Sequence, residues 1–466
     1  MASQAAHPPL RAVLRKQAAA PQQADTSAAP ERLRAEQDGL QAQPYVPPAG
    51  ADPHTLLDAD SWSMNPAAVA WQLSGSNPDF AVVGVLGAQG LGKSSLLNRL
   101  LGLDSGSESP GFPLARPAAA SLLPPLQHCT HGIQLRASPD RLIGLDTQPL
   151  FSASVLEEMS SGGWQQPPPA LAAPAVAAAG DAKAPAVPFE GVQTLAELQL
   201  AVFLLTACHR LLVLCDGEED RRTWELLLAA EMLARGVPDP SLPPQGTAGP
   251  AGTAGAAAGS TGGGQHLHSQ QSAAAAAAQQ QAAAAAARGR QAPPAAEHLA
   301  EVVLVHVQRP GGIGGSQPPT AAQLEALEAR LAAFFGSSRL CQPGPLRMRD
   351  HLPGSTSGSW HAGGAGSGAS QESSMDSAAS HAAVGYWVLP APCGGAAWGE
   401  QVDVLVAALL ARPCPPSARR CSELGWLRGA AGDVWRGVRK SADIAAFYSR
   451  LARTQLKGAG GWGLAR

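Results

Sequence analysis

The sequence predicts an α/β fold built on a mostly parallel sheet with helices on both faces. Two observations support this prediction. Short apolar runs rich in Val, Leu and Ile alternate with longer segments of helical periodicity, a pattern typical of strands that are buried on both sides of a parallel sheet. In addition, the first strong strand is followed directly by a glycine-rich loop and a helix, the arrangement that a phosphate-binding loop requires.

The predicted elements follow one another along most of the chain. A short helix is expected over Pro66–Leu73, because proline is favoured in a first helical turn. Phe80–Leu86 is a continuous apolar run and Ser94–Leu100 has helical spacing. Further strands are expected at Ile133–Leu135, Arg141–Leu145, Leu211–Cys215, Val302–Val307 and Tyr386–Leu389. Further helices are expected around Val192–His209, Arg222–Ala234 and Ala321–Phe335, with Leu195–Ala207 deep against the sheet.

Composition separates folded from low-complexity parts of the chain. The chain contains 51 glycines and 41 prolines beside long runs of Ala, Gln and Ser. Such runs bury too little apolar surface to offset the entropy of ordering them. The expected organisation is a disordered tail (1–55), the P-loop half of a G-like domain (56–163), an Ala/Pro-rich insertion (164–188), the domain continued (189–237), a low-complexity insertion (238–297), the domain continued (298–352), a Gly/Ser-rich insertion (353–381), and a last strand, helix and C-terminal helical tail (382–456).

Charge and cysteine usage exclude several function classes. The net charge is -3, so the basic excess typical of direct DNA or RNA binding is missing. The seven cysteines form no CxxC pair, so zinc-ligand spacing is absent and a reducing compartment is favoured. Cys208 and Cys215 are expected to be small buried hydrophobes. No apolar run approaches the ~20 residues that cross a bilayer, and we expect no membrane association.

The N-terminus leaves two interpretations open. Arg11, Arg15 and Lys16 occur before the first acid, Asp25, which resembles an organellar transit peptide. An Ala/Arg-rich disordered tail explains the same residues more simply, so we expect a cytoplasmic protein.

The strongest functional signal is Gly87-Ala-Gln-Gly-Leu-Gly-Lys-Ser94, a full G-x-x-x-x-G-K-[ST] match between a strand and a helix. Its glycines allow backbone N–H groups to surround a phosphate, Lys93 reaches the outer phosphates and Ser94 is a Mg²⁺ ligand. The residues expected to bind the nucleotide are Gly87, Gln89, Gly90, Leu91, Gly92, Lys93, Ser94 and Ser95.

Two residues outside the loop are candidate partners of Mg²⁺. Asp146 ends an apolar strand in Arg141–Pro149, where P-loop proteins place a second metal contact; a strand-end turn residue is the alternative. Thr130 lies between the P-loop and Asp146, where a GTPase has its switch threonine, although a lone threonine there is more often a turn residue. Nearby His131 is expected to face solvent rather than act in catalysis.

Several parts of an active GTPase are missing. Pro149 occupies the position where a glycine amide would sense the γ-phosphate, and proline has no N–H. After Val302–Val307 the chain reads Gln308-Arg-Pro-Gly, with no carboxylate to read guanine. The cofactor is therefore a purine nucleoside di- or triphosphate, ATP or GTP, with Mg²⁺. The acidic cluster Asp216–Asp220 is expected to be a solvated loop and helix start rather than a metal site.

The last ordered feature is a helical tail within Trp426–Leu451. Ile444, Tyr448 and Leu451 share one helical face, with basic residues nearby. Such a tail packs on its own domain or lies in the groove of a partner, and the pattern does not separate the two.

These motifs together resemble the Smg nine family of G-domain-like regulatory subunits of the kinase complex in nonsense-mediated mRNA decay. The Asp-Thr-Gln-Pro variant at Asp146–Pro149 is the most telling, because ordinary GTPases have glycine there. The matching stretches are Val82–Ser94, Leu145–Leu150, Phe203–His209, Trp435–Ser441 and Tyr448–Leu451.

The resemblance implies a non-catalytic, nucleotide-binding subunit. It implies a heterodimer with a second G-like subunit, Smg eight, and docking on the Smg one kinase, whose phosphorylation of the Upf helicase the pair restrains. The alternatives are a self-standing P-loop NTPase, either a GTPase or an ATPase, and an organellar P-loop protein if the N-terminus is a targeting segment.

Overall fold

The computed structural model of this 466-residue chain describes residues 54–103, 111–114, 127–161, 189–235, 237, 298–308, 319–351, 383–392, 396–413, 421–447 and 450. The predicted insertions at 164–188, 238–297 and 353–381, and the predicted tail 1–55 apart from residues 54 and 55, lie outside the described residues. None of the described helices is long and apolar enough to cross a membrane.

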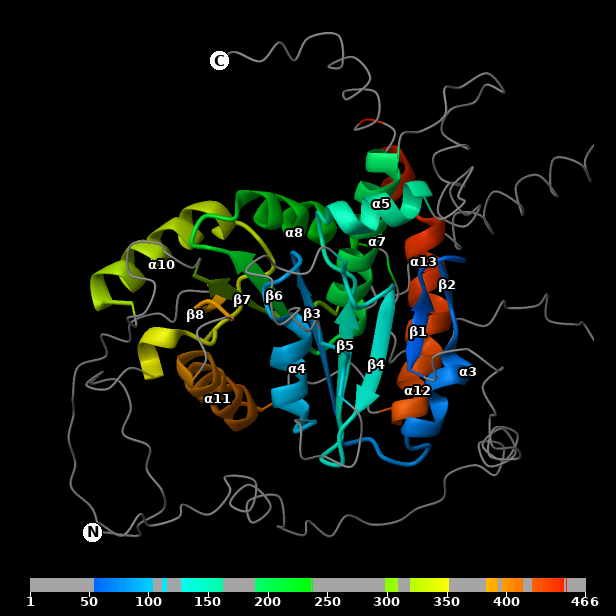
Figure 1. The fold of residues 1–466 in the computed structure, drawn as a ribbon, viewed down its shortest axis with the longest axis horizontal. Helices are drawn as coiled ribbons and strands as arrows, with labels where there is room; N and C mark the ends of the chain where they lie inside the picture. Colours follow the sequence, from blue (N-terminus) through cyan, green and yellow to red (C-terminus); the bar gives the residue numbers. More distant parts are fainter. Residues whose placement is uncertain are drawn as a thin grey trace, which may run out of the picture.

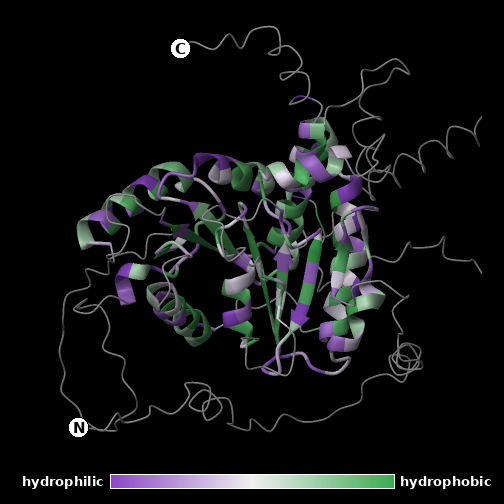
Figure 2. Cartoon of the chain, in the orientation of Figure 1, coloured by the Kyte–Doolittle hydropathy of each residue, from purple (hydrophilic) through white to green (hydrophobic). Residues whose placement is uncertain are grey.

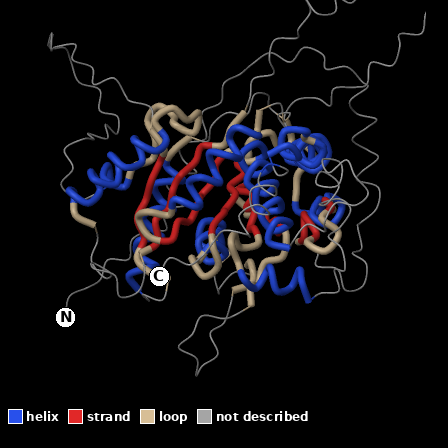
Figure 3. Tube along the Cα trace, turned by 90° about the horizontal axis from the view of Figure 1, so that it is seen from above, coloured by secondary structure: helices blue, strands red, loops and turns tan. Residues whose placement is uncertain are grey.

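One mixed, mostly parallel sheet forms the centre of the molecule (Figures 1 and 3). Its eight strands lie in the order β2-β1-β4-β5-β3-β6-β7-β8. They are β1 (Thr55–Asp58), β2 (Ser63–Met64), β3 (Ala81–Gly87), β4 (Ile133–Ala137), β5 (Leu142–Thr147), β6 (Arg210–Asp216), β7 (Glu301–Val307) and β8 (Gly385–Leu389). The α/β fold with a mostly parallel sheet is confirmed, and its P-loop arrangement is consistent with a G-like domain.

The longer helices flank this sheet. They are α4 (Lys93–Leu101), α5 (Ala153–Ser161), α7 (Phe189–Ala207), α8 (Arg221–Leu233), α10 (Ala321–Phe335) and α11 (Ala396–Ala411). Shorter elements are α3 (Pro66–Val69), η1 (Ala70–Gln72), η2 (Met348–His351), α12 (Glu423–Arg428), η3 (Gly429–Val434) and α13 (Trp435–Lys440).

Two glycines of neighbouring strands show that α4 and α7 cover opposite faces. Gly144 of β5 pairs with Val83 of β3, so Gly84 points to the other face. A Cβ on Gly144 would approach Leu101 of α4 to 2.7 Å, and one on Gly84 would approach the Cys208 sulfur, just beyond α7, to 2.8 Å. The sheet is therefore sandwiched, and close helix contact on each face requires glycine in the strand.

The central strands and α7 are the apolar core (Figure 2). All seven residues of β7 are buried, and so is nearly the whole of α7. Cys208 and Cys215 are fully buried, as expected for small hydrophobes. Local signals define the helix starts, because Asp220 caps α8 and Thr320 forms a capping box with Gln323 at α10.

Strands β1 and β2 were not expected from the sequence, whereas β4 was. Strands β1 and β2 pair with each other, and β1 pairs with β4, in antiparallel fashion. The strand β4 is also antiparallel to β5. Thr55–Asp58 and Ser63–Met64 are short and only partly buried. Neither contains a long apolar run, so the sequence pattern did not predict them as strands.

The C-terminal helices pack on the domain itself. Trp426 Nε1 donates to the Ala207 carbonyl at 2.8 Å, and the Trp435 ring meets Phe203 edge-on. Ile444 is fully buried, whereas Tyr448 and Leu451 lie outside the described residues. Of the two roles considered for the tail, Trp426–Ile444 therefore takes the intramolecular one.

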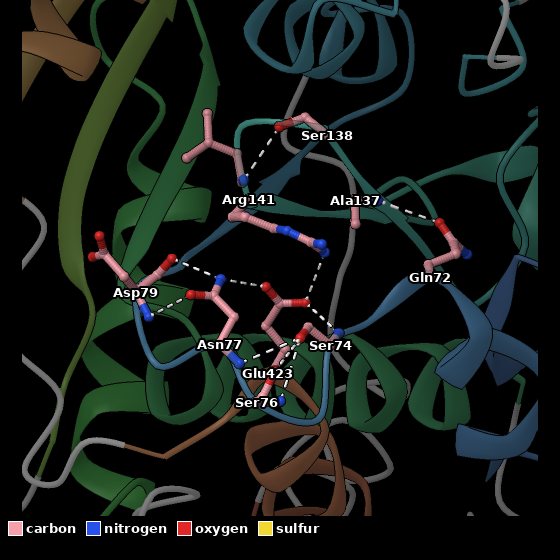
Figure 4. A network of polar contacts seen from close by, with 10 residues as sticks. Gln72, Ser74, Ser76, Asn77, Asp79, Ala137, Ser138, Arg141 and Glu423 are labelled. Atoms are coloured by element: carbon pink, nitrogen blue, oxygen red, sulfur yellow. Dashed lines mark hydrogen bonds and ion pairs between the residues drawn. The ribbon is translucent and has the colours of Figure 1, made fainter. Parts of the chain in front are cut away.

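A polar network attaches α12 to the loop before β3 (Figure 4). The Glu423 carboxylate accepts hydrogen bonds from the Ser74 amide (2.6 Å) and the Asn77 side-chain amide (2.8 Å). Arg141 forms an ion pair with the same carboxylate at 3.3 Å. Glu423 is fully buried, so these contacts replace the water that its charge loses.

Candidate functional site

The loop between β3 and α4 has the backbone of a phosphate-binding loop. Gly90 and Gly92 have φ of 82° and 86°, a region that glycine enters without a Cβ clash. A Cβ on Gly90 would have no atom within 4 Å, so the loop opens to free space there. A Cβ on Gly92 would approach Trp398 of α11 to 2.8 Å. Gly92 is thus required by both its φ and its neighbour.

Lys93 lies folded over this loop. Its ammonium group donates to the Ala88 carbonyl at 3.1 Å, and the residue is buried. Burial lowers the pKa of Lys93 to about 8, and the nearby Asp146 charge opposes that shift. The side chain therefore remains mainly protonated at pH 7 and places a positive charge at the loop.

The three residues expected at Mg²⁺ converge on one point. The Ser94 hydroxyl donates to Asp146 Oδ2 at 2.6 Å. The Thr130 hydroxyl donates to the same oxygen at 2.8 Å. Ser94 lies in the first turn of α4, Asp146 lies near the end of β5, and Thr130 precedes β4, so three separate parts of the chain bring these oxygens together.

Asp146 is the hydrogen-bond acceptor at the centre of this cluster. It is fully buried, and its Oδ1 has no hydrogen-bond partner among the described residues. Burial raises the pKa of Asp146, while the Lys93 charge and hydrogen bonds, those from Ser94 and Thr130 among them, act in the opposite direction. An unpartnered buried carboxylate oxygen beside two hydroxyl groups is an environment suited to a hydrated Mg²⁺ ion, which prefers oxygen ligands.

The remaining P-loop residues have structural neighbours. Gln89 Oε1 accepts hydrogen bonds from the hydroxyls of Ser152 (2.7 Å) and Ser154 (3.0 Å), so its side chain is directed at the start of α5. Leu91 is buried, and Ser95 is half-buried in the first turn of α4. Any phosphate contact of Gln89 and Leu91 would therefore be made by their backbone amides.

The segment after Asp146 is attached to the P-loop. The Thr147 hydroxyl donates to the Val85 carbonyl at 2.8 Å. The Leu150 amide donates to the Gly87 carbonyl at 3.0 Å. Leu150 is buried and follows Pro149 directly. The place where a GTPase keeps its mobile γ-phosphate sensor is therefore tied to β3 by one backbone hydrogen bond and one from the Thr147 hydroxyl.

Neighbouring polar groups outside the loop are mainly structural. Asp220 caps α8, and Glu218 pairs with Arg330 at 2.7 Å. The cluster Asp216–Asp220 is therefore a loop and helix start, as interpreted from the sequence.

The residues after β7 are those where a guanine-reading motif would lie. The Gln308 amide donates to the Leu389 carbonyl at 2.9 Å, and Arg309 and Pro310 lie outside the described residues.

Sequence reasoning missed the partners of the histidines that flank Thr130. His131 is exposed, as expected, but its Nδ1 lies 3.3 Å from Glu158 Oε2. His128 is also within reach of Glu158, and burial, together with the charges of His131 and Lys93, lowers the pKa of His128 to about 4. His128 is therefore neutral at pH 7. The H-C-T-H spacing was the available signal, but Glu158 lies on a helix far along the chain.

Comparison with known proteins identifies similar chains. Over 171 residues, the chain is 32% identical to the nonsense-mediated mRNA decay factor SMG9 of Xenopus laevis and to that of Xenopus tropicalis, and 29% identical to that of Salmo salar. The match covers 37% of this chain and about 30% of each relative. No family model matches the chain. The resemblance drawn from the motifs is confirmed: over this segment the chain is SMG9-like.

Proposed function

We propose that this chain is a nucleotide-binding regulatory subunit of the kinase complex in nonsense-mediated mRNA decay, with at most weak hydrolysis of its nucleotide. The similarity to proteins named as nonsense-mediated mRNA decay factors carries this proposal. The assembled Ser94–Asp146–Thr130 cluster and the Pro149 segment support its nucleotide-binding and non-hydrolytic parts.

In this proposal the main task is assembly in the cytoplasm. The chain pairs with a second G-like subunit, Smg eight, and the pair docks on the Smg one kinase and modulates phosphorylation of the Upf helicase. Because Trp426–Ile444 packs on its own domain, this part of the tail is assigned to the fold rather than to a partner groove.

The nucleotide is ATP or GTP, or its diphosphate, with Mg²⁺. The backbone of Gly87–Ser94 and Lys93 would hold the phosphates, and Ser94, Thr130 and Asp146 would hold the metal. A bound Mg²⁺ ion neutralises phosphate charge. A nucleotide that binds only the folded state stabilises the fold by mass action, which is the role we assign to this ligand.

Isothermal titration of the nucleotide-free chain with ADP, ATP, GDP and GTP, each with Mg²⁺, tests the ligand. We expect binding of at least one nucleotide by the wild type and a large loss in Lys93→Ala. Lys440→Ala removes one exposed lysine elsewhere and should bind like the wild type. A folded wild type that binds none of the four, or a Lys93→Ala chain that binds equally well, contradicts the nucleotide proposal.

Affinity purification of the tagged chain from its own cells tests the assembly. Recovery of a large kinase of the Smg one type and a second G-like subunit is the expected result. Recovery of neither, with the chain inside an organelle, would overturn both the function and the cytoplasmic location and would favour an organellar P-loop protein.

The rival is a self-standing P-loop NTPase. The assembled serine, threonine and aspartate favour it, because an active enzyme uses such groups for Mg²⁺. Steady-state hydrolysis by the purified chain separates the two. Rates well above the intrinsic range of GTPases, ~10⁻⁴ to 10⁻² s⁻¹, support the enzyme, and rates within or below it support the regulatory subunit.

A further inference from the structure

A second cluster of ligand-type side chains lies beside the P-loop. His128, His131 and Glu158 each offer one ligand atom, and these atoms lie within 4.8 Å of one another. Glu158 Oε2 is 3.0 Å from His128 Nε2 and 3.3 Å from His131 Nδ1. The three residues line a pocket of about 420 Å³ that is open to solvent.

The two distances from Glu158 Oε2 to the histidine nitrogens are close to the ligand spacing of a coordinated cation. In a tetrahedral zinc site with bonds of about 2.0–2.2 Å, neighbouring ligand atoms are about 3.3 Å apart. Two imidazole nitrogens and one carboxylate oxygen form a ligand set that zinc accepts, with a fourth position left for water. Nitrogen ligands are unsuited to Mg²⁺ and Ca²⁺, which prefer oxygen.

The most buried ligand is already oriented by its neighbours. The His128 side chain is only 6% exposed, and its Nδ1 lies 2.8 Å from the Ser154 hydroxyl. The Ser154 hydroxyl donates onward to Gln89 Oε1. Because Nδ1 is engaged by Ser154, Nε2 is the ring nitrogen directed at Glu158. Such outer contacts fix the tautomer and ring position of a metal-binding histidine.

We propose that His128, His131 and Glu158 bind one divalent transition-metal ion of the zinc type. The two histidines flank Thr130, whose hydroxyl points to Asp146. Glu158 comes from α5. A cation here would join the 128–131 segment to α5 and hold Thr130 at the nucleotide site. The site is distinct from the all-oxygen cluster at Asp146, and it stands whether or not the chain binds a nucleotide.

Titration of the metal-free, untagged full chain with Zn²⁺ tests the proposal, with Mg²⁺ as the comparison cation. We expect one Zn²⁺ per chain and no Mg²⁺ at these residues. His131→Ala and Glu158→Gln should each weaken Zn²⁺ binding by about 100-fold or more, and Ser154→Ala by roughly tenfold. Glu157→Gln changes the same charge one residue earlier, on an exposed pocket residue outside the cluster, and should bind like the wild type.

Co²⁺ provides a second measurement on the unaltered protein. A four-coordinate Co²⁺ spectrum that Zn²⁺ displaces supports the site even if a variant fails to fold. X-ray absorption of the Zn²⁺ form should then report two imidazole ligands. Absence of stoichiometric Zn²⁺ binding by the wild type overturns the proposal. Equal binding by a folded His131→Ala chain, or six-coordinate Co²⁺ without imidazole, overturns it as well.

Discussion

Glu197 is the residue whose burial has the clearest consequence for pH. It is 2% exposed, and it accepts a hydrogen bond from the Phe151 amide at 2.6 Å. Burial raises the pKa of Glu197 to about 7, against the Phe151 amide and the charge of Arg222. The Arg222 guanidinium lies over the Phe151 ring, 3.8 Å from its centroid. Glu197 therefore anchors the segment that follows Pro149.

We predict that Glu197→Gln removes a pH-dependent loss of stability. Because the folded-state pKa exceeds the unfolded value, the native state holds the extra proton between about pH 4.5 and 7, and the free energy of unfolding falls as pH rises through that window. The loss is on the order of 3 kcal/mol. Glutamine keeps the acceptor for Phe151 without ionising.

Thermal unfolding of both proteins from pH 4 to pH 8 measures this effect. The variant should match the wild type near pH 4 and exceed it above pH 7. Parallel stability curves over the whole range would mean that Glu197 has an ordinary pKa in the fold.

At the scale of elements, the segment Thr147–Phe151 decides whether the site behaves as a switch. The Leu150 amide donates to Gly87 and the Thr147 hydroxyl donates to Val85. The Phe151 amide donates to Glu197. Restoring an amide at Pro149 therefore does not free the segment. We predict that Pro149→Gly leaves hydrolysis within the intrinsic GTPase range of ~10⁻⁴ to 10⁻² s⁻¹.

Single-turnover hydrolysis by wild type and Pro149→Gly, with equal nucleotide occupancy, checks this. A gain of more than about 100-fold, which is roughly 2.7 kcal/mol of barrier, would show that the missing amide alone limits the reaction.

The C-terminal helices are the second element-scale feature. Glu423 joins residues more than 280 positions away in the chain, Ser74, Asn77 and Arg141. We predict that Glu423→Ala lowers the free energy of unfolding by about 1–3 kcal/mol, since it leaves the half-buried Ser74 and Asn77 donors without their acceptor. Trp426→Ala should lose about 3–5 kcal/mol through the cavity it creates.

Chemical denaturation measures both losses. Glu400→Ala, on the exposed side of α11, is the matched control and should stay within about 0.5 kcal/mol of the wild type. A Glu423→Ala protein as stable as this control would show that α12 is not held to the domain in solution.

At the scale of the whole molecule, we expect that part of the chain between α8 and β7 can be deleted without unfolding the domain. The stretch 238–291 is Gly/Ala/Gln-rich without an apolar face, and loop length changes closure entropy only slowly. We predict that deleting 238–291 leaves the midpoint of thermal unfolding within a few degrees of the wild type, because the paired strands β6 and β7 are untouched. A drop of more than about 10 °C would mean that the stretch packs on the core.

The sequence by itself determined the parts that depend on local pattern. The apolar runs at β3, β6 and β7, the helix Ala321–Phe335 and the glycine loop were all identified from their own residues, and the structure confirms these elements. Asp146 and Thr130 were proposed as metal partners from their places after the P-loop in the sequence, and the structure brings the Ser94 and Thr130 hydroxyls to Asp146.

Only the tertiary structure decided the rest. The pairing of β1 with β4, the Glu423 network and the approach of Glu158 to His128 and His131 depend on residues far apart in the chain. No local periodicity records such pairs, because they form when apolar side chains are buried and polar groups are paired against distant surfaces of the assembled sheet. The same packing placed the tail on its own domain, a choice between two surfaces that an amphipathic pattern leaves equal.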